Sequence, residues 1–336
     1  MTVSIETALG APARRASFHA LCTRLLQVLY QHRVMSTDQL QRLLLPRAGN
    51  ASYLRRQLRE LLTAGLVQRV WASHRPTPDP ISRKGRPVKP PYLWFLTEEG
   101  AQSVEDGGEL QSRPYRVTAE AVAGARQQHT LAVNEMGIAF SRHAARLGHE
   151  CGPLDWMPEV AHRIRDGVRR FEDDHVITDA VLHYVHVRRG QRAMMTLFLE
   201  MDRATMTAAR LAAKVAAYGR LHEYVPQHPD RARRSAATSR PAWQYTYPAF
   251  PRLLVVLDGK PSPTLAAQLA ARTEDLYTLT RADPRLGRLA GRLSIGVTTL
   301  QLLQHRGPFE PIFTPLLRGT PESRHPMTDL YLKTAG

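Results

Sequence analysis

The chain has 336 residues, and its 46 Lys and Arg residues exceed its 30 Asp and Glu residues by 16. A chain of this length suggests about two domains, and one this basic usually meets a polyanion, most often nucleic acid, although general solubility is the alternative. Two distant cysteines, Cys22 and Cys151, exclude a disulfide framework and a cysteine zinc site. Without a signal peptide or an apolar run of roughly 18 residues, the sequence predicts a cytoplasmic protein with no membrane partner.

The first predicted elements are three short helices. Apolar residues at helical spacing predict a helix over 18–32. Ser36 followed three residues later by Gln39 is a capping box, so a second helix opens there and ends before Pro46. A third helix is predicted over 51–64, with leucines facing inward and arginines facing outward.

A two-stranded hairpin is predicted after these helices. LVQRVWAS at 66–73 and YLWFL at 92–96 are typical of strands, and a basic, proline-rich loop separates them. Three helices, a strand, a basic loop and a returning strand predict a winged helix-turn-helix over 15–105. GLVQR at 65–69 and LTEEG at 96–100 resemble the matching segments of many bacterial winged-helix regulators.

The cations of this predicted domain suit double-stranded DNA. A recognition helix in the major groove needs long donors on its outer face, and the loop cations suit phosphates or a minor groove. Residues 1–100 hold 15 basic and 6 acidic residues, a balance of 15 − 6 = +9. The alternatives are an ordinary solvated face and a protein-docking module. The predicted DNA-binding residues are Arg55, Arg56, Arg59, Arg83, Lys84, Arg86 and Lys89.

The rest of the chain is predicted to be a linker over 106–118, an α/β domain over 119–305 and an extended, proline-bearing tail over 306–336. Helix, three strands, helix and strand form an order that is typical of an α/β sandwich. The predicted helices are 119–147 (with a break near Gly124), 204–224 and 262–282, and the predicted strands are 156–165, 175–187, 194–202, 252–258 and 294–303.

Three acidic residues stand out in this domain. Asp179 lies inside an apolar strand, and Glu200 and Asp202 lie near the end of the next one. Residues two apart on a strand share a face, and adjacent strands could bring Asp179 beside the other two. Buried carboxylates are costly unless they bind a cation, and hard oxygen ligands suit Mg²⁺ or Mn²⁺. The sequence therefore predicts Asp179 and Glu200 as metal ligands, with Asp202 assisting.

Lys214 is one of five lysines beside 41 arginines, and it lies on the apolar side of its predicted helix, between Tyr218 and Leu221. A compact ammonium there could orient an attacking water or stabilise charge on a phosphoryl group. A salt bridge to Asp202 without any chemistry is the alternative.

The element order resembles the PD-(D/E)xK nuclease fold, in which acids on two adjacent strands hold a metal. More specifically, residues 18–303 are similar to the replication-relaxation family of plasmid and mobile-element proteins. That family has a winged helix, a helix opening near HxLAVNE, strands carrying D and EMDR, and a KxxxY helix. The matching residues are His129, Asn134, Glu135, Asp179, Glu200, Asp202, Arg203, Lys214 and Tyr218.

One position departs from the nuclease pattern. A lysine normally stands two residues after the strand acid, and this chain has Asp202 there. Lys214 could replace that lysine from the next helix; otherwise the domain would bind metal or DNA without cutting. Glu135 could join the catalytic site from the first helix of the domain, or it could be an ordinary surface carboxylate.

Two functions follow from these patterns. The first is a DNA nuclease or nickase of plasmid replication or conjugative transfer, with Mg²⁺ or Mn²⁺ as cofactor. The second is a non-catalytic DNA-binding regulator or replication accessory with an inactive nuclease-like domain. The expected partners are double-stranded DNA and replication or transfer proteins, and a homodimer would suit a palindromic site.

Overall fold

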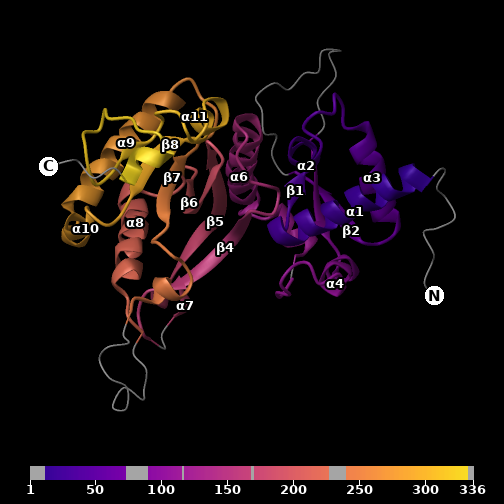
Figure 1. Cartoon of the computed structure of the whole chain (residues 1–336), viewed down its shortest axis with the longest axis horizontal. Coiled ribbons are helices and arrows are strands. Elements are labelled where there is room, and N and C mark those ends of the chain that lie inside the picture. The colour runs from indigo at the N-terminus through magenta and orange to yellow at the C-terminus, as the bar shows by residue number, and fades with distance from the viewer. Residues whose placement is uncertain (1–11, 73–89, 116, 168–169, 227–239, 332–336) are drawn as a thin grey trace. The chain divides into compact units, whose positions relative to one another are not determined.

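The computed structural model describes residues 12–72, 90–115, 117–167, 170–226 and 240–331 (Figure 1). The chain forms two compact units, Met1–Asn134 and Glu135–Gly336. The division falls inside helix α6 (Gln127–Leu147), on the C-terminal side of the predicted linker. No helix of the described ranges combines the length and the apolar character that a membrane span requires.

The first unit holds a small antiparallel sheet of order β1-β3-β2 among short helices. The predicted helices and both hairpin strands are present, whereas β1 and α4 were not predicted. The elements are α1 (Pro12–His32), β1 (Met35–Ser36), α2 (Thr37–Leu44), α3 (Ser52–Thr63), β2 (Val67–Trp71), β3 (Tyr92–Leu96), α4 (Glu98–Asp106) and α5 (Ala119–Ala123).

Local capping explains where α2 begins. The Ser36 hydroxyl accepts a hydrogen bond from the Gln39 amide at 3.1 Å, and the Gln39 side chain accepts one from the Ser36 amide at 3.2 Å. This reciprocal pair satisfies two amides that the first turn of the helix leaves without partners. The predicted capping box is therefore confirmed.

The segment predicted as a linker packs on the first unit. The Tyr115 ring stacks on Tyr30 of α1 with 5.6 Å between centroids. Arg113 donates from Nη2 to the Tyr30 carbonyl at 2.6 Å. Arg113 and Tyr115 of this segment are therefore held against α1.

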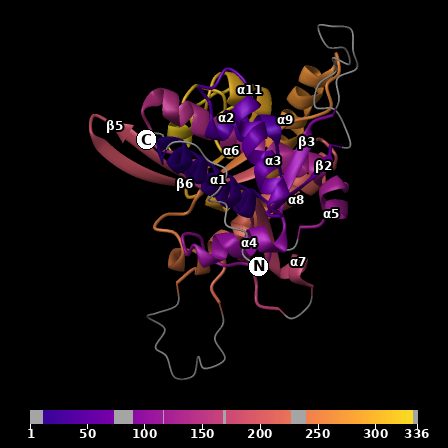
Figure 2. The same cartoon turned by 90° about the vertical axis from the view of Figure 1, so that its right-hand side faces the viewer.

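The second unit is built on a mixed six-stranded sheet of order β4-β5-β6-β7-β8-β9. The pairs β6–β7 and β7–β8 are parallel, and the other pairs are antiparallel. Figure 2 shows β5 and β6 as long curved neighbours. The strands are β4 (Trp156–Arg163), β5 (His175–Arg188), β6 (Gln191–Asp202), β7 (Arg252–Leu257), β8 (Ile295–Thr299) and β9 (Thr314–Pro315).

Helices cover both faces of this sheet (Figure 1). Leu211 and Tyr218 of α8 and Leu276 of α9 share a core with Phe198 and Val255 of the sheet. On the other face, the Phe140 ring of α6 meets Tyr184 edge-on at 6.3 Å. The remaining helices are α7 (Phe171–Asp174), α8 (Ala208–Glu223), η4 (Ala242–Tyr245), α9 (Leu265–Ala282), α10 (Pro284–Leu289), α11 (Leu300–His305) and η5 (Met327–Tyr331).

Two predictions near the C-terminus were wrong. The strand expected over 294–303 ends at Thr299, because the Thr299 hydroxyl accepts from the Leu302 amide at 3.2 Å and caps α11. The segment expected to be an extended tail contributes β9, which pairs with β8, and it buries Phe313 and Leu316 completely. Apolar burial along the sheet edge therefore outweighs the proline content that suggested a tail.

Candidate functional sites

A distortion in β5 brings two consecutive side chains to the helix α8 side of the sheet. Thr178 Oγ1 lies 3.1 Å from the Tyr218 hydroxyl, and Asp179 Oδ1 accepts from Lys214 Nζ at 3.1 Å. Consecutive residues of a regular strand point to opposite faces. The neighbouring strand is irregular at the same place, since Glu159 has a φ of 55° between the pairs Pro158–Ala180 and Val160–Thr178. The register is the same on both sides of this point, so neither strand carries an inserted residue, and the irregular backbone itself accounts for the changed direction of the side chains.

Asp179, Glu200 and Lys214 form one ion cluster. Lys214 Nζ contacts both Asp179 Oδ1 and Glu200 Oε2, so the two carboxylates converge on a single ammonium. Asp179 Oδ2 also accepts from the Met201 amide of β6 at 2.7 Å. Adjacent strands thus supply the two acids, and the following helix supplies the amine, as the sequence predicted.

The burial of the cluster is graded. The Glu200 side chain is 2% exposed, whereas Asp179 is 12% and Lys214 28% exposed. Burial and then the Asp179 charge raise the pKa of Glu200 well above its ordinary value, despite Lys214. Burial lowers the pKa of Lys214, but the two carboxylates outweigh it and the net pKa is raised. The cluster is therefore an ammonium between two acids, reachable from solvent on its Lys214 side.

A buried hydrogen-bond chain supports Glu200 from behind. The Tyr218 hydroxyl donates to Glu200 Oε1 and lies next to Thr178 Oγ1. Thr178 Oγ1 is in turn 3.2 Å from His162 Nδ1, and His162 Nε2 is 2.7 Å from the Tyr247 hydroxyl. Four side chains thus fix the position of one carboxylate, which is the kind of support that holds a functional group in place.

The other two predicted acids have different partners. Asp202 is fully buried and forms an ion pair with Arg272 of α9, whose Nη2 also donates to the Met206 carbonyl at 2.7 Å. Glu135 of α6 accepts from Gln304 Nε2 at 2.8 Å. In the described ranges no three His, Cys, Asp or Glu side chains gather closely enough to hold a metal ion. The structure therefore brings together Asp179, Glu200 and Lys214, without Asp202 or Glu135.

Sequence reasoning missed Arg272, the partner of Asp202, and two residues behind the cluster, His162 and Tyr247. Arg272 follows Leu269 by three residues and precedes Leu276 by four, so it lies on the buried stripe of α9. That spacing was its available signal. His162 and Tyr247 come from distant segments, and nothing in their local sequence marks them as partners of Thr178.

The predicted recognition helix presents its arginines to solvent. Leu54 and Leu58 of α3 are fully buried, and the arginines at positions 55, 56 and 59 are exposed. Arg56 lies 3.9 Å from Glu60 and 5.2 Å from the centre of the Tyr53 ring, which leaves it a surface side chain. The loop cations Arg83, Lys84, Arg86 and Lys89 lie outside the described residues.

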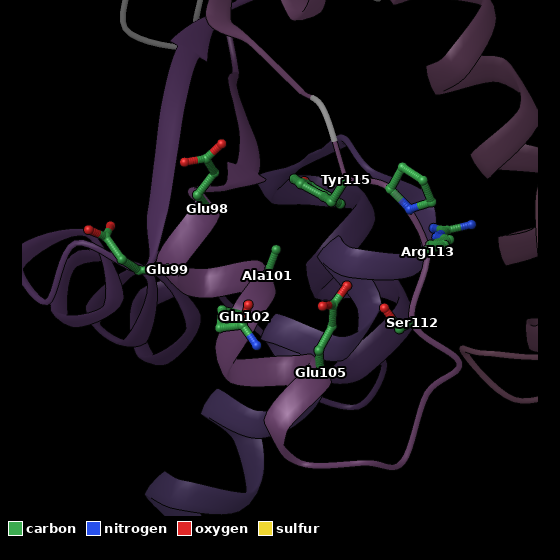
Figure 3. Close-up of a pocket in the computed structure, with 9 residues that line it drawn as sticks. Glu98, Glu99, Ala101, Gln102, Glu105, Ser112, Arg113 and Tyr115 are labelled. Carbon is green, nitrogen blue, oxygen red and sulfur yellow. The ribbon is translucent and has the colours of Figure 1, made fainter.

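A pocket of about 630 Å³ lies beside α4 in the first unit (Figure 3). Carboxylates dominate its polar lining, and Arg113 contributes a positive charge. Such a lining does not suit a polyanion, so this pocket is no candidate for DNA. The lining residues are Glu98, Glu99, Ala101, Gln102, Glu105, Ser112, Arg113, Pro114 and Tyr115.

Fold and site together define a mixed α+β protein with a helical N-terminal unit and a lysine-bridged pair of carboxylates on a mixed sheet. The family model described as replication-relaxation matches residues 26–233, more than half of the chain. The chain belongs to the replication-relaxation family. No curated protein and no solved structure gives a significant match.

Proposed function

We propose that this chain is a DNA-binding protein of plasmid or mobile-element replication, and that its first unit is a winged helix that binds double-stranded DNA. The observation that carries the proposal is the exposed arginine face of α3 on a helix anchored by buried leucines. The net charge of +16 and the family membership support it. Arginines on an outer helix face can donate to guanine edges and to phosphates.

The test is the binding of a fluorescently labelled duplex of roughly 30 base pairs, about three helical turns. Replacement of Arg55, Arg56 and Arg59 by Ala should weaken binding at least tenfold, since each arginine that is removed can no longer reach a phosphate or a base. The matched control removes three exposed arginines of the second unit, Arg142, Arg281 and Arg288. Equally weakened binding in both triple variants would show that net charge alone, and not α3, drives binding.

A second function is favoured by the convergence of Asp179 and Glu200 on one cation. The donor set fits a divalent ion, because two hard carboxylates already share one positive charge and Mg²⁺ commonly takes one or two carboxylates with water and phosphate oxygens. When bound, such an ion would activate water and stabilise phosphoryl charge. We therefore propose that the second unit hydrolyses phosphodiester bonds in DNA.

The residues of the chain would act as follows. Asp179 and Glu200 would hold the ion, and Tyr218 would orient Glu200 through its hydrogen bond. Lys214, which is the most exposed member of the cluster, would bind the phosphate charge of the substrate. Asp202, paired with Arg272, would hold the end of β6 against α9.

Supercoiled plasmid incubated with Mg²⁺ or Mn²⁺ tests this second function. The wild-type protein should nick or linearise it, and Glu200→Ala and Lys214→Ala should abolish cleavage. Glu274→Gln, which changes an exposed acid on α9, serves as the control and should cleave normally. Uncut plasmid with every metal, in preparations that still bind duplex DNA, would leave a non-catalytic replication protein as the function.

A further inference from the structure

One face of the β2–β3 hairpin carries a ladder of aromatic rings with a guanidinium. Trp71 and Tyr92 are cross-strand partners, and their rings stack with 3.9 Å between centroids and 26° between planes. The Arg69 guanidinium lies 4.0 Å from the Tyr92 centroid and 5.5 Å from the Trp94 centroid. Residues 69 and 71 share a face with their partners 94 and 92, so all four side chains are neighbours.

This ladder is anchored at one end and open at the other. Trp94 is 2% exposed, and its indole donates to Thr37 Oγ1 of α2 at 2.9 Å. Trp71 is 46% exposed. The opposite face of the hairpin places Leu93 and Phe95 in a separate core cluster. Core packing therefore fixes the hairpin while much of the Trp71 indole stays in solvent.

The chemistry of the open end matches a nucleobase attached to a phosphate backbone. An aromatic ring stacks on any base, and a nearby arginine adds a cation for the phosphate or the base face. The chain between the two strands, residues 73–89, contains five basic residues and one acidic residue, so its composition also favours a polyanion. Bases inside an intact duplex are stacked on each other, so the base that meets Trp71 must be unpaired.

We propose that Trp71, backed by Tyr92 and Arg69, stacks on an unpaired base, and that the protein prefers DNA in which unpaired bases adjoin a duplex. The inference rests on the DNA-binding function proposed above and adds its substrate class. The recognition helix contacts the paired segment, and the open end of the ladder holds a base from the melted one.

Two labelled probes of equal length test this, one fully paired and one with a central stretch of about five mismatched pairs. Wild-type protein should bind the mismatched probe roughly tenfold more tightly, and Trp71→Ala should lose about that factor on it alone. Trp71→Phe, which keeps a ring, should retain most of the preference. The control is Tyr245→Ala, because Tyr245 is also an exposed ring, 59% accessible, with Arg240 4.1 Å from its centroid.

Several outcomes would overturn the inference. If Trp71→Ala weakens both probes equally, or neither, Trp71 does not hold an unpaired base. If Trp71→Ala changes only the oligomeric state in sedimentation, the ladder is an interface between copies of the chain. If the wild-type protein binds the paired probe through the α3 arginines but shows no preference for the mismatched probe, the inference about Trp71 is rejected and the proposed DNA-binding function is not. Failure to bind either probe rejects the proposed DNA-binding function as well.

Discussion

The Glu200 carboxylate is held at both oxygens, by Lys214 at Oε2 and by the Tyr218 hydroxyl at Oε1. A buried charge without such partners destabilises the folded state. Removal of one partner from a buried ion pair typically lowers the free energy of unfolding by ~3 kcal/mol or more. Each partner therefore stabilises the fold as well as the site. This dual role means that substitutions at the cluster need a measurement of stability beside any measurement of activity.

Tyr218→Phe removes the hydroxyl that donates to Glu200 while it keeps the ring that packs on Phe198. We expect a decrease of about 1–3 kcal/mol in the free energy of unfolding, because a buried carboxylate oxygen then lacks a donor. Urea denaturation measures this decrease. Tyr245→Phe, at an exposed tyrosine, should change stability by less than about 0.5 kcal/mol. Equal effects would mean that Glu200 does not depend on Tyr218.

His162 should make stability depend on pH. Burial lowers the pKa of His162 to about 4 from its ordinary value of 6.5, despite the backbone hydrogen bond of Val160. The unfolded chain therefore binds the proton more readily, and the stability from neutral His162 is complete above about pH 6.5 and is lost as pH falls toward 4. The loss of stability reaches an upper limit of about 3 kcal/mol at the acid end.

The measurement is urea denaturation of the wild-type protein and His162→Gln at several pH values. The stability difference between them should shrink as pH falls from about 7 to about 4.5, because Gln takes up no proton. Other histidines contribute equally to both proteins and cancel. Gln301→Ala, at an exposed residue without a titratable group, should differ from the wild-type protein by the same amount at every pH. A constant difference at His162 would contradict the burial argument.

Elements with a strong local signal were predicted well, and those made by distant contacts were not. The capping box of α2 and the YLWFL strand are visible in a few residues, and the structure has both. Strand β9 has two residues and exists because β8 offers an edge. Helix α11 interrupts an apolar run whose spacing fits a strand equally well.

The candidate site shows the same contrast between features with a local sequence signal and features made by distant contacts. Alternation along β6 predicted that Glu200 and Asp202 share a face, and the apolar stripe of α8 predicted Lys214 on the inner side of its helix, where the structure has it in contact with Glu200. The distortion at Asp179 and the pairing of Asp202 with Arg272 depend on neighbouring strands and on α9. No local pattern encodes such long-range pairings, so Asp202 was expected beside Asp179.

At the scale of elements, α6 approaches β4 through a glycine. A Cβ on Gly137 would lie 2.3 Å from the Trp156 ring, and Trp156 is fully buried. Gly137→Ala should therefore destabilise the protein by about 1–3 kcal/mol, despite the better helix propensity of alanine. The matched control is Gly287→Ala in α10, where a Cβ meets nothing within 4 Å and should be neutral or slightly stabilising. Thermal unfolding of both variants decides between these expectations.

At the scale of the whole molecule, acidic and basic residues are unevenly distributed. The net +16 coexists with an acidic pocket beside α4 in the first unit, so we expect the proposed attraction to DNA to be local to surfaces such as α3. A local interface releases a limited number of counterions, and this number is measurable as the slope of log binding constant against log salt concentration. The slope therefore distinguishes a specific DNA surface from diffuse attraction by the whole chain.

Replacement of Arg55, Arg56 and Arg59 by Ala should reduce this slope by up to about 3, roughly 0.9 for each phosphate that an arginine no longer neutralises. Replacement of the same residues by Lys should keep the slope, because the positive charges remain. The difference in binding affinity between preferred and random DNA sequences should become smaller, because lysine lacks the two-pronged donor geometry that reads guanine. Anisotropy titrations at several salt concentrations measure both quantities. An unchanged slope in the Ala variant would place the phosphate-binding residues elsewhere and remove α3 from the DNA interface.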